Sequence, residues 1–157
     1  MSAPRAEAVA EPSRILELLE RCFVITLACH DDQGCWAAPV FYAHRDFELF
    51  FTSSPASRHA RALGFDAHVA GAVHGPADDW SAIVGLQVSG VARALSPAEA
   101  DVARDVYGRR FPFVASDPRL AAALRSSGWY GLVLDEVALT DNARGFGQRA
   151  RWRRDAA

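Results

Sequence analysis

The strongest constraint on the fold is a run of three apolar segments joined by very short turns. The segments are rich in the β-branched and aromatic residues that favour strands, and they cover residues 22–28, 35–43 and 47–52. The turn-forming sequence Asp31-Asp32-Gln33-Gly34 separates the first two, and His44-Arg45-Asp46 separates the last two. Connections this short join antiparallel neighbours, because a parallel crossover needs many more residues. The sequence therefore predicts an antiparallel β-meander.

The third segment leads directly into a hydroxyl-rich turn and a basic helix. Residues 52–53 end the strand, Ser54 is placed to cap a helix, and Pro55 suits the first helical position. Free N–H groups and the positive end of the helix dipole would then point at one spot, which favours a phosphate. Arg58 and His59 would add side-chain donors. The alternative is an ordinary capped surface helix whose arginine and histidine are solvated.

The rest of the chain alternates helices with longer strands. Helices are expected over residues 15–21 with Ser13 as cap, from the capping box Ser96-Pro97-Ala98-Glu99 to Arg109, and over 117–125. Strands are expected over 68–74, 80–94 and 129–139, and the glycines Gly85 and Gly90 favour bulges or tight bends. The pattern predicts an α+β protein built on a small antiparallel barrel. We expect residues 1–12 to form a flexible tail and residues 13–157 a single domain.

Composition excludes several functions. The chain has 157 residues, is 50% hydrophobic and can bury an adequate core without disulfides or metals. Its formal net charge is −2 with both signs interspersed, which disfavours nucleic-acid binding. All 17 basic residues are arginine, so neither Schiff-base chemistry nor a Walker lysine is available. No stretch is long and apolar enough for a membrane span and no signal peptide is evident, so we expect a cytoplasmic protein.

The reactive side chains form no familiar catalytic pattern. The three cysteines are expected as reduced, buried thiols, although Cys29 and Cys35 could face each other across a hairpin. Their spacing, with His30 nearby, does not fit a zinc site, and we expect no metal. No serine-hydrolase elbow, P-loop, dinucleotide glycine fingerprint or nucleophile–base pair is evident. The paired aspartates at 31–32 and 78–79 are expected to be solvated turn residues.

A series of short tracts carries a resemblance to a known family. The tracts include Phe41-Tyr42, Arg58-His59-Ala60, Val69-Ala70-Gly71, residues 85–90, residues 107–112, Thr140-Asp141-Asn142 and Gly145-Phe146-Gly147. Their order and spacing resemble the YhbP-like branch of the pyridoxamine 5′-phosphate oxidase-like superfamily of FMN-binding split barrels. The resemblance implies a six-stranded antiparallel split β-barrel with a few flanking short helices. It also implies a homodimer with two FMN sites at the subunit interface, each assembled from both chains.

The resemblance gives the hydroxyl-rich turn and the basic helix a role in holding the FMN phosphate. Ser57, Arg58 and His59 occupy the run that grips this phosphate in the family, and Thr52 and Ser53 would lie near the phosphate or the ribityl chain. Histidine stands where the oxidases have lysine. The charge at this position would therefore depend on pH, since an unperturbed imidazole titrates near ~6.5.

The resemblance also implies which residues meet the flavin ring. Pro39, Val40 and Phe41 would lie along the isoalloxazine, and Gln87 stands where a glutamine of the partner subunit meets the flavin. Residues 38–43 lack the arginine and lysine with which the oxidases hold phosphate and substrate, which argues against vitamin B6 phosphate oxidation. Catalytic residues are not identified.

Further residues have two interpretations each. Aromatic residues could stack on the ring or belong to the core; these are Phe41, Tyr42, Trp80 and Trp129. At most one of Arg109 and Arg110 would reach the site, because adjacent helical residues diverge by about 100°, and the other would pair with Asp101 or Asp105. The C-terminal segment 151–154 resembles the oxidase signature only loosely and equally fits a solvated basic tail.

Three functional hypotheses follow. The first is an FMN-dependent oxidoreductase or flavin reductase acting on an unidentified small molecule. The second is a non-catalytic dimer that carries or senses a flavin, a deazaflavin or haem. The third is a structural dimer without a ligand, which the missing basic pair on the second strand would favour.

Overall fold

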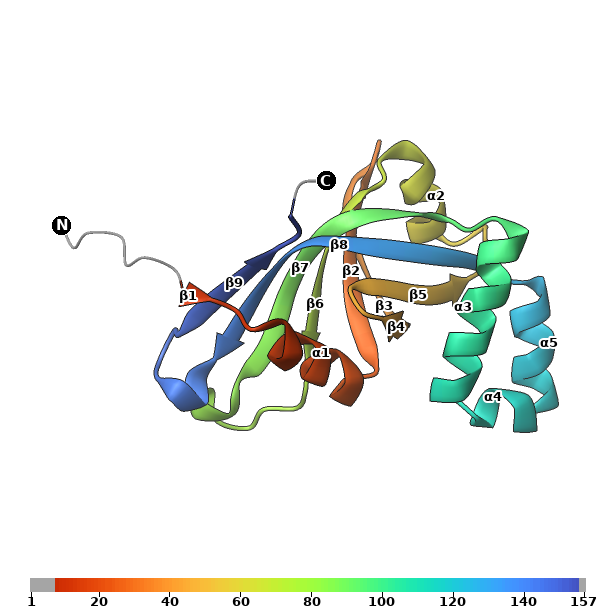
Figure 1. Ribbon diagram of the computed structural model, residues 1–157. Coiled ribbons are helices and arrows are strands. Elements are labelled where there is room, and N and C mark those ends of the chain that lie inside the picture. The colour runs from red at the N-terminus through yellow and green to blue at the C-terminus, as the bar shows by residue number, and fades with distance from the viewer. Residues whose placement is uncertain (1–7, 156–157) are drawn as a thin grey trace.

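The computed structural model describes residues 8–155, which are built around one large β-sheet (Figure 1). Its strands are β1 (Ala8–Val9), β2 (Val24–Asp31), β3 (Gly34–Phe41), β4 (Ala43–Arg45), β5 (Glu48–Ser53), β6 (His68–His74), β7 (Val84–Ala94), β8 (Gly128–Asp141) and β9 (Arg149–Arg153). Its helices are α1 (Pro12–Arg21), α2 (Arg58–Phe65), α3 (Pro97–Arg110), α4 (Phe113–Ser116) and α5 (Pro118–Ser126). No helix within residues 8–155 is long and apolar enough to cross a membrane.

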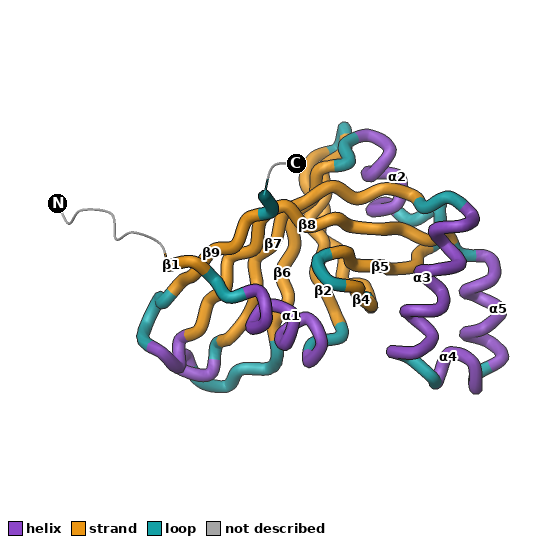
Figure 2. The backbone as a smooth tube through the Cα atoms, viewed as in Figure 1, coloured by secondary structure: helices purple, strands orange, loops and turns teal. Residues whose placement is uncertain are grey.

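Six strands form a split barrel, as predicted. They pair antiparallel in the order β3-β2-β6-β7-β8-β5 and curve round toward each other (Figures 1 and 2). β3 and β5 approach at the seam, where the described residues form no ladder. α1 lies against the barrel and buries Ile15, Leu18 and Leu19 in its interior. The seam leaves one edge of β3 open, which matters for the site below.

β5 is buried on both faces, and this joins the barrel to the helical part of the molecule. Leu49 and Phe51 pack in the barrel interior, whereas Phe50 between them belongs to a second core with Tyr107 of α3 and Trp129 of β8. Successive side chains of a strand point to opposite faces, so one strand can serve both cores. The apolar run at residues 49–51 is therefore a doubly covered strand.

Tyr42 interrupts the predicted second strand of the meander. β3 ends at Phe41 and pairs with β2, while β4 begins at Ala43 and pairs with β5. Tyr42 is fully buried between them; its N–H donates to the Phe23 carbonyl at 3.1 Å and its hydroxyl to the Leu19 carbonyl at 2.8 Å. The prediction of one continuous strand over residues 35–43 was therefore wrong.

Local signals placed the caps of two helices incorrectly. α1 begins at Pro12, so Ser13 lies inside the helix and does not cap it. α2 begins at Arg58 with Ser57 as its cap, and Pro55 lies in the preceding turn. The capping box of α3 is confirmed, with both the Ser96 and Glu99 side chains engaged. α5 also begins where predicted, capped by Asp117.

The long strand β7 begins later than predicted. Residues 80–82 form a 3₁₀ turn, capped by the Asp79 side chain, and the strand starts at Val84. Its register against β8 shifts between Ser89 and Gly90, which confirms a bulge at Gly90. A Cβ at Gly90 would collide with the carbonyl of a β8 residue, so glycine is required there. Gly85 pairs in regular register, and the bulge expected there is absent from the described ladder.

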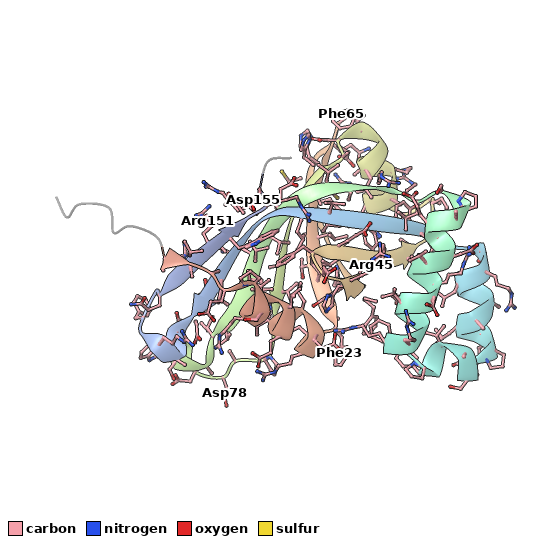
Figure 3. The ribbon with its side chains drawn as sticks, in the orientation of Figure 1. Phe23, Arg45, Phe65, Asp78, Arg151 and Asp155 are labelled. Atoms are coloured by element: carbon pink, nitrogen blue, oxygen red, sulfur yellow. The ribbon has the colours of Figure 1, made fainter. Side chains whose placement is uncertain are left out.

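Both ends of the described chain form strands, although a flexible tail was expected over residues 1–12 and a solvated tail was one of two interpretations of residues 151–154. The C-terminal segment forms β9 on β8, and Trp152 stacks on Phe47 with ring centroids 3.9 Å apart. β1 pairs parallel with β9, so residues 8–12 are not a free tail, while residues 1–7 lie outside the described residues. Figure 3 shows Arg151 and Asp155 near the C-terminal end of the described chain, in the region of β9.

The cysteines are free thiols, as expected, but they are not all buried. Cys29 is buried and lies opposite Trp36, whereas Cys35 is exposed and lies opposite His30. The two thiols therefore do not face each other across the hairpin. No cluster of metal-binding side chains occurs among the residues that the structure describes.

Candidate functional site

The end of β5 and the start of α2 bring two serines and a histidine together, which we call the hydroxyl–imidazole cluster (Ser53, Ser57 and His59). The Ser53 hydroxyl lies 2.8 Å from His59 Nε2 and 3.0 Å from the Ser57 hydroxyl. The Ser57 hydroxyl lies 3.4 Å from the same imidazole nitrogen and accepts from the Ala60 N–H at 3.3 Å as the cap of α2. The cluster thus stands at a helix N-terminus, as the sequence predicted.

The electrostatics of this cluster suit an anion. Burial lowers the pKa of His59, so the imidazole is held neutral in the absence of a nearby negative charge. The first turn of α2 carries N–H groups without intrahelical partners, and hydroxyl hydrogens rotate to meet an acceptor. The donors present therefore fit the oxygens of a phosphate without a lysine.

Arg58 does not point at this cluster. Its Nε and one terminal nitrogen donate to the two carboxylate oxygens of Asp31, at 2.9 and 3.0 Å. Its guanidinium also lies 4.6 Å from the ring centroid of Trp36 on β3. The Arg58 guanidinium lowers the pKa of Asp31. Asp31 is thus a paired residue at the end of β2, and the expectation that it is a solvated turn carboxylate was wrong.

Thr52 also lies apart from the cluster. Its hydroxyl donates to the Gly128 carbonyl at 3.0 Å, and it stands directly opposite Trp129 on β8. Because side chains alternate along a strand, Thr52 and Ser53 face opposite sides of the β5–β8 pair. Of these two predicted residues, the structure brings only Ser53 to the cluster.

β3 supplies an open apolar surface beside α2 and β5. Pro39 and Phe41 are exposed, while Val40 packs against the barrel core. The Phe41 ring lies 5.5 Å from that of Phe111 and is 50% exposed. Proline suits this place because it has no N–H to donate to a ladder.

Gln87 does not meet the cluster within one chain. It is exposed on β7, at one end of a row that runs across β6 and β2 to Pro39 on β3. Three strand spacings separate Gln87 from Pro39 in that row, or about 14 Å. Gln87 also lines a shallow cavity of about 310 Å³ together with His74 and Thr140.

The same side of the sheet forms a broad surface without charged side chains, which we call the outer face. It consists of two adjacent cross-strand rows: Pro39, Thr26, Ala72 and Gln87, and Ala37, Ala28, Ala70 and Ser89. All eight residues are exposed or half-buried, and most are small. Small side chains allow another surface to approach the sheet closely.

Comparison with known proteins identifies the family. No protein-family model matches the sequence. The UPF0306 protein YhbP of Salmonella schwarzengrund is 36% identical over 140 residues, which cover 88% of this chain and 90% of that protein. The chain belongs to the UPF0306 (YhbP) family. YhbP of Salmonella paratyphi A is 34% identical over the same length.

Solved structures show that this UPF0306 chain has the pyridoxamine 5′-phosphate oxidase-like fold. A protein from Listeria innocua assigned as a pyridoxamine 5′-phosphate oxidase has a TM-score of 0.65 at 14% identity, over 83% of this chain and 98% of that one. An FAD-binding protein from Mesorhizobium loti has a TM-score of 0.62 at 18% identity, and the match covers 82% of this chain and 92% of that one. A haem-binding protein from Mycobacterium smegmatis gives 0.73 at 21% identity; the match covers 92% of this chain and 60% of that longer one.

The two adjacent arginines of α3 in this UPF0306 chain lie outside the cluster. Arg109 pairs with Asp105 at 2.8 Å, which was one of the two partners predicted for an arginine at this place. Arg110 is nearly buried and donates through one nitrogen to the carbonyls of Leu19, Glu20 and Cys22 at 2.7–2.9 Å. It thereby caps the C-terminus of α1. The sequence held no signal for this contact, because about 90 residues separate the partners.

The predicted aromatic residues divide between core and surface. Tyr42 and Trp129 are buried, so they belong to the core and are not available to a ring that lies on β3. Trp80 is 55% exposed and its ring packs edge-on against Phe146. Of the four, only Phe41 lies on β3, where it is 50% exposed and its ring packs edge-on against Phe111.

The cluster contains a serine and a histidine at the distance of a nucleophile and its base, which the sequence did not reveal. Ser53 and His59 are 2.8 Å apart, but Ser57 approaches the same nitrogen. A general base must become positively charged, and the positive end of the α2 dipole disfavours that charge. The same dipole favours an anionic ligand. The arrangement therefore suits anion binding better than nucleophilic catalysis.

Proposed function

We propose that this UPF0306 protein is an FMN-binding homodimer that acts as a flavin-dependent oxidoreductase on a small molecule. The observation that carries the proposal is the hydroxyl–imidazole cluster at the start of α2, next to the open apolar surface of β3. A phosphate site beside an apolar strand edge matches the two ends of FMN. The flavin-binding neighbour with the same fold supports this choice of ligand.

The residues of the chain would hold FMN at its two ends. Ser53, Ser57 and His59 would bind the phosphate with rotatable hydroxyls and an imidazole N–H. Pro39 and Phe41 would lie along the isoalloxazine ring and exclude water from it. FMN supplies hydride and single-electron transfer when bound, so the protein needs no catalytic nucleophile of its own. Arg58, paired with Asp31, would fix α2 against the β2–β3 hairpin instead of gripping the phosphate.

The outer face supports the homodimer. Its eight positions carry no charge, and small residues at most of them would let two sheets approach face to face. A two-fold interface presents the same surface from both subunits. Gln87 and Pro39 lie at opposite ends of one row, so apposition of two copies would bring Gln87 of the partner subunit toward the β3 surface of the first.

An absorbance spectrum of purified protein, taken after addition of FMN and removal of the excess, tests the proposal. We expect flavin bands that stay with the protein at one copy per chain. Ser53→Ala and His59→Gln are expected to weaken FMN binding by about tenfold each, since each removes a hydrogen bond to a charged group. His68→Gln, which changes an exposed histidine paired with Asp66, serves as the control. Absence of retained flavin from the wild type would overturn the proposal.

A second candidate function is non-catalytic binding of haem or a flavin. The haem-binding neighbour from Mycobacterium smegmatis, at a TM-score of 0.73, favours it. The same experiment separates the candidates, because bound haem gives a Soret band and a bound flavin does not. A retained flavin that NADH, NADPH and candidate acceptors fail to turn over would indicate a carrier or sensor. No retained ligand of either kind would favour a structural dimer.

A further inference from the structure

A cavity of about 250 Å³ lies between α3 and α5, away from the hydroxyl–imidazole cluster. The two helices stand side by side and α4 joins their ends (Figures 1 and 2). Most of the lining is apolar and includes Tyr107 from α3, Val114 from α4, Leu124 from α5 and Trp129 from β8. The cavity is on the Trp129 side of the β5–β8 pair, whereas Ser53 faces the other side.

α5 covers this cavity without filling it. The helix is amphipathic, yet none of its residues is buried, and Leu120 on it is 40% exposed. A helix of nine residues is not stable alone and depends on packing against its neighbours. Protein interiors are otherwise close-packed, so an apolar space beneath such a helix is the place where a ligand can complete the packing.

The polar groups around the cavity are positive or are donors. Arg104 of α3 and Arg125 of α5 stand on its two helical walls, and no acidic residue belongs to the lining. Arg104 also pairs with Asp101, but that pair is exposed and therefore weak. Trp129 is 6% exposed, and its indole N–H is buried without a hydrogen-bond partner among the described residues. An unpartnered polar group on a nearly buried side chain indicates a missing partner.

We propose that this cavity binds a small organic acid with an aromatic or short aliphatic body. The body packs between Trp129, Tyr107 and Leu124, and the carboxylate binds Arg104 and Arg125 at the mouth. A volume of about 250 Å³ admits a molecule with one ring, since ligand pockets of larger compounds start near ~300 Å³. This site does not depend on FMN, and its failure or success leaves the proposed flavin function untouched.

Calorimetric titration with benzoate and with its neutral analogue benzamide tests the charge of the ligand. We expect benzoate to bind the wild type more tightly, and Arg125→Gln to weaken benzoate by about tenfold while changing benzamide little. Arg119→Gln is the matched control, because Arg119 is on the same helix but does not line the cavity. The proposal would be overturned if Arg125→Gln weakened benzoate and benzamide equally, or if the wild type did not bind benzoate.

Gly108 allows a second test that does not remove any charge. It lines the cavity on α3, and a Cβ placed there meets no atom within 4 Å. Gly108→Leu would extend a side chain into the open space and improve helix propensity, so it is expected to fold and to abolish benzoate binding. Gly108→Ala improves propensity without filling the cavity and is expected to retain binding. If Gly108→Leu binds benzoate with the same affinity as the wild type, the ligand lies elsewhere and this site is refuted.

Discussion

In the proposed FMN site, His59 is the residue whose charge would decide how strongly the cluster attracts the phosphate. Burial lowers its pKa in the free protein, while a phosphate dianion beside it favours the protonated imidazole. Binding of FMN at the proposed site would therefore take up a proton. We expect FMN affinity to fall as the pH rises from the lowered pKa of His59 in the free protein to its higher pKa in the complex, by at most about tenfold per pH unit, and to level off above the latter. Fluorescence titration with FMN from pH 6.5 to 8.5 measures this slope.

A lysine at position 59 provides the matched comparison. His59→Lys places a charge that titrates near ~10.4 and restores the residue type that the oxidases carry. We expect the variant to bind FMN with an affinity that stays flat between pH 6.5 and 8.5. If the wild type already shows a flat profile, His59 is not in contact with the phosphate, whatever the lysine variant does.

Residue-level contacts also explain which parts of the site the sequence could predict. The cluster was predictable because Ser53, Ser57 and His59 lie within seven positions along one strand–turn–helix unit. The pairing of Arg58 with Asp31 was not, since 27 residues separate them and only the docking of α2 on β2 brings them together. A lone arginine after a turn looks the same in sequence whether it binds a ligand or a carboxylate of its own chain.

Elements with strong local signals were predicted, and elements that depend on distant contacts were not. The capping box at Ser96 fixed the start of α3, and the apolar pattern gave β6 over residues 68–74 as observed. β9 was missed because its five residues are mostly arginine, and it is held in place by distant contacts: its ladder to β8 and the stacking of Trp152 on Phe47. The break at Tyr42 likewise depends on its contacts with residues 19 and 23. Tertiary packing overrides local preference in both places.

Arg110 links two elements, α3 and α1, and its removal is expected to destabilise the protein. Arg110→Met keeps much of the side-chain volume but leaves the carbonyls of Leu19, Glu20 and Cys22 without their donor. We expect a loss of about 2–4 kcal/mol in the free energy of unfolding, measured by urea denaturation, since hydrogen bonds to charged groups are worth ~1.5–3 kcal/mol each.

The neighbouring arginine separates this cap from a general effect of charge. Arg109→Met removes the same charge from the same helix, but Arg109 is exposed, and its one ion pair within residues 8–155 is with Asp105 on the same helix. Exposed pairs contribute little, so we expect a change within about 0.5 kcal/mol. Equal losses for the two variants would contradict the assignment of Arg110 as the cap of α1.

At the scale of the whole molecule, the open seam and one end of the outer face meet at the same strand, β3. Its unpaired edge and its exposed Trp36 and Phe41 leave apolar surface and backbone groups that a second copy would cover. The hydroxyl–imidazole cluster lies at the end of this seam, whereas Gln87 is across the sheet. One chain alone thus separates the residues that the proposed FMN site needs, and a dimer is the simplest way to reunite them.

Pairing differently damaged subunits tests whether one FMN site is shared between two chains. The His59→Gln and Gln87→Leu homodimers are each expected to bind FMN about tenfold more weakly and to retain little of it once the excess is removed. In a heterodimer of the two variants, isolated through two affinity tags, a shared site leaves one intact pair, so about half of the sites retain FMN. The control is a heterodimer of wild type with the chain that carries both substitutions. If the site is shared, this control has no intact pair and retains little FMN. If each site lies within one chain, the two results are reversed, because only the control then contains an undamaged chain. Flavin absorbance per dimer distinguishes these outcomes, and retention in the control alone would refute the shared site.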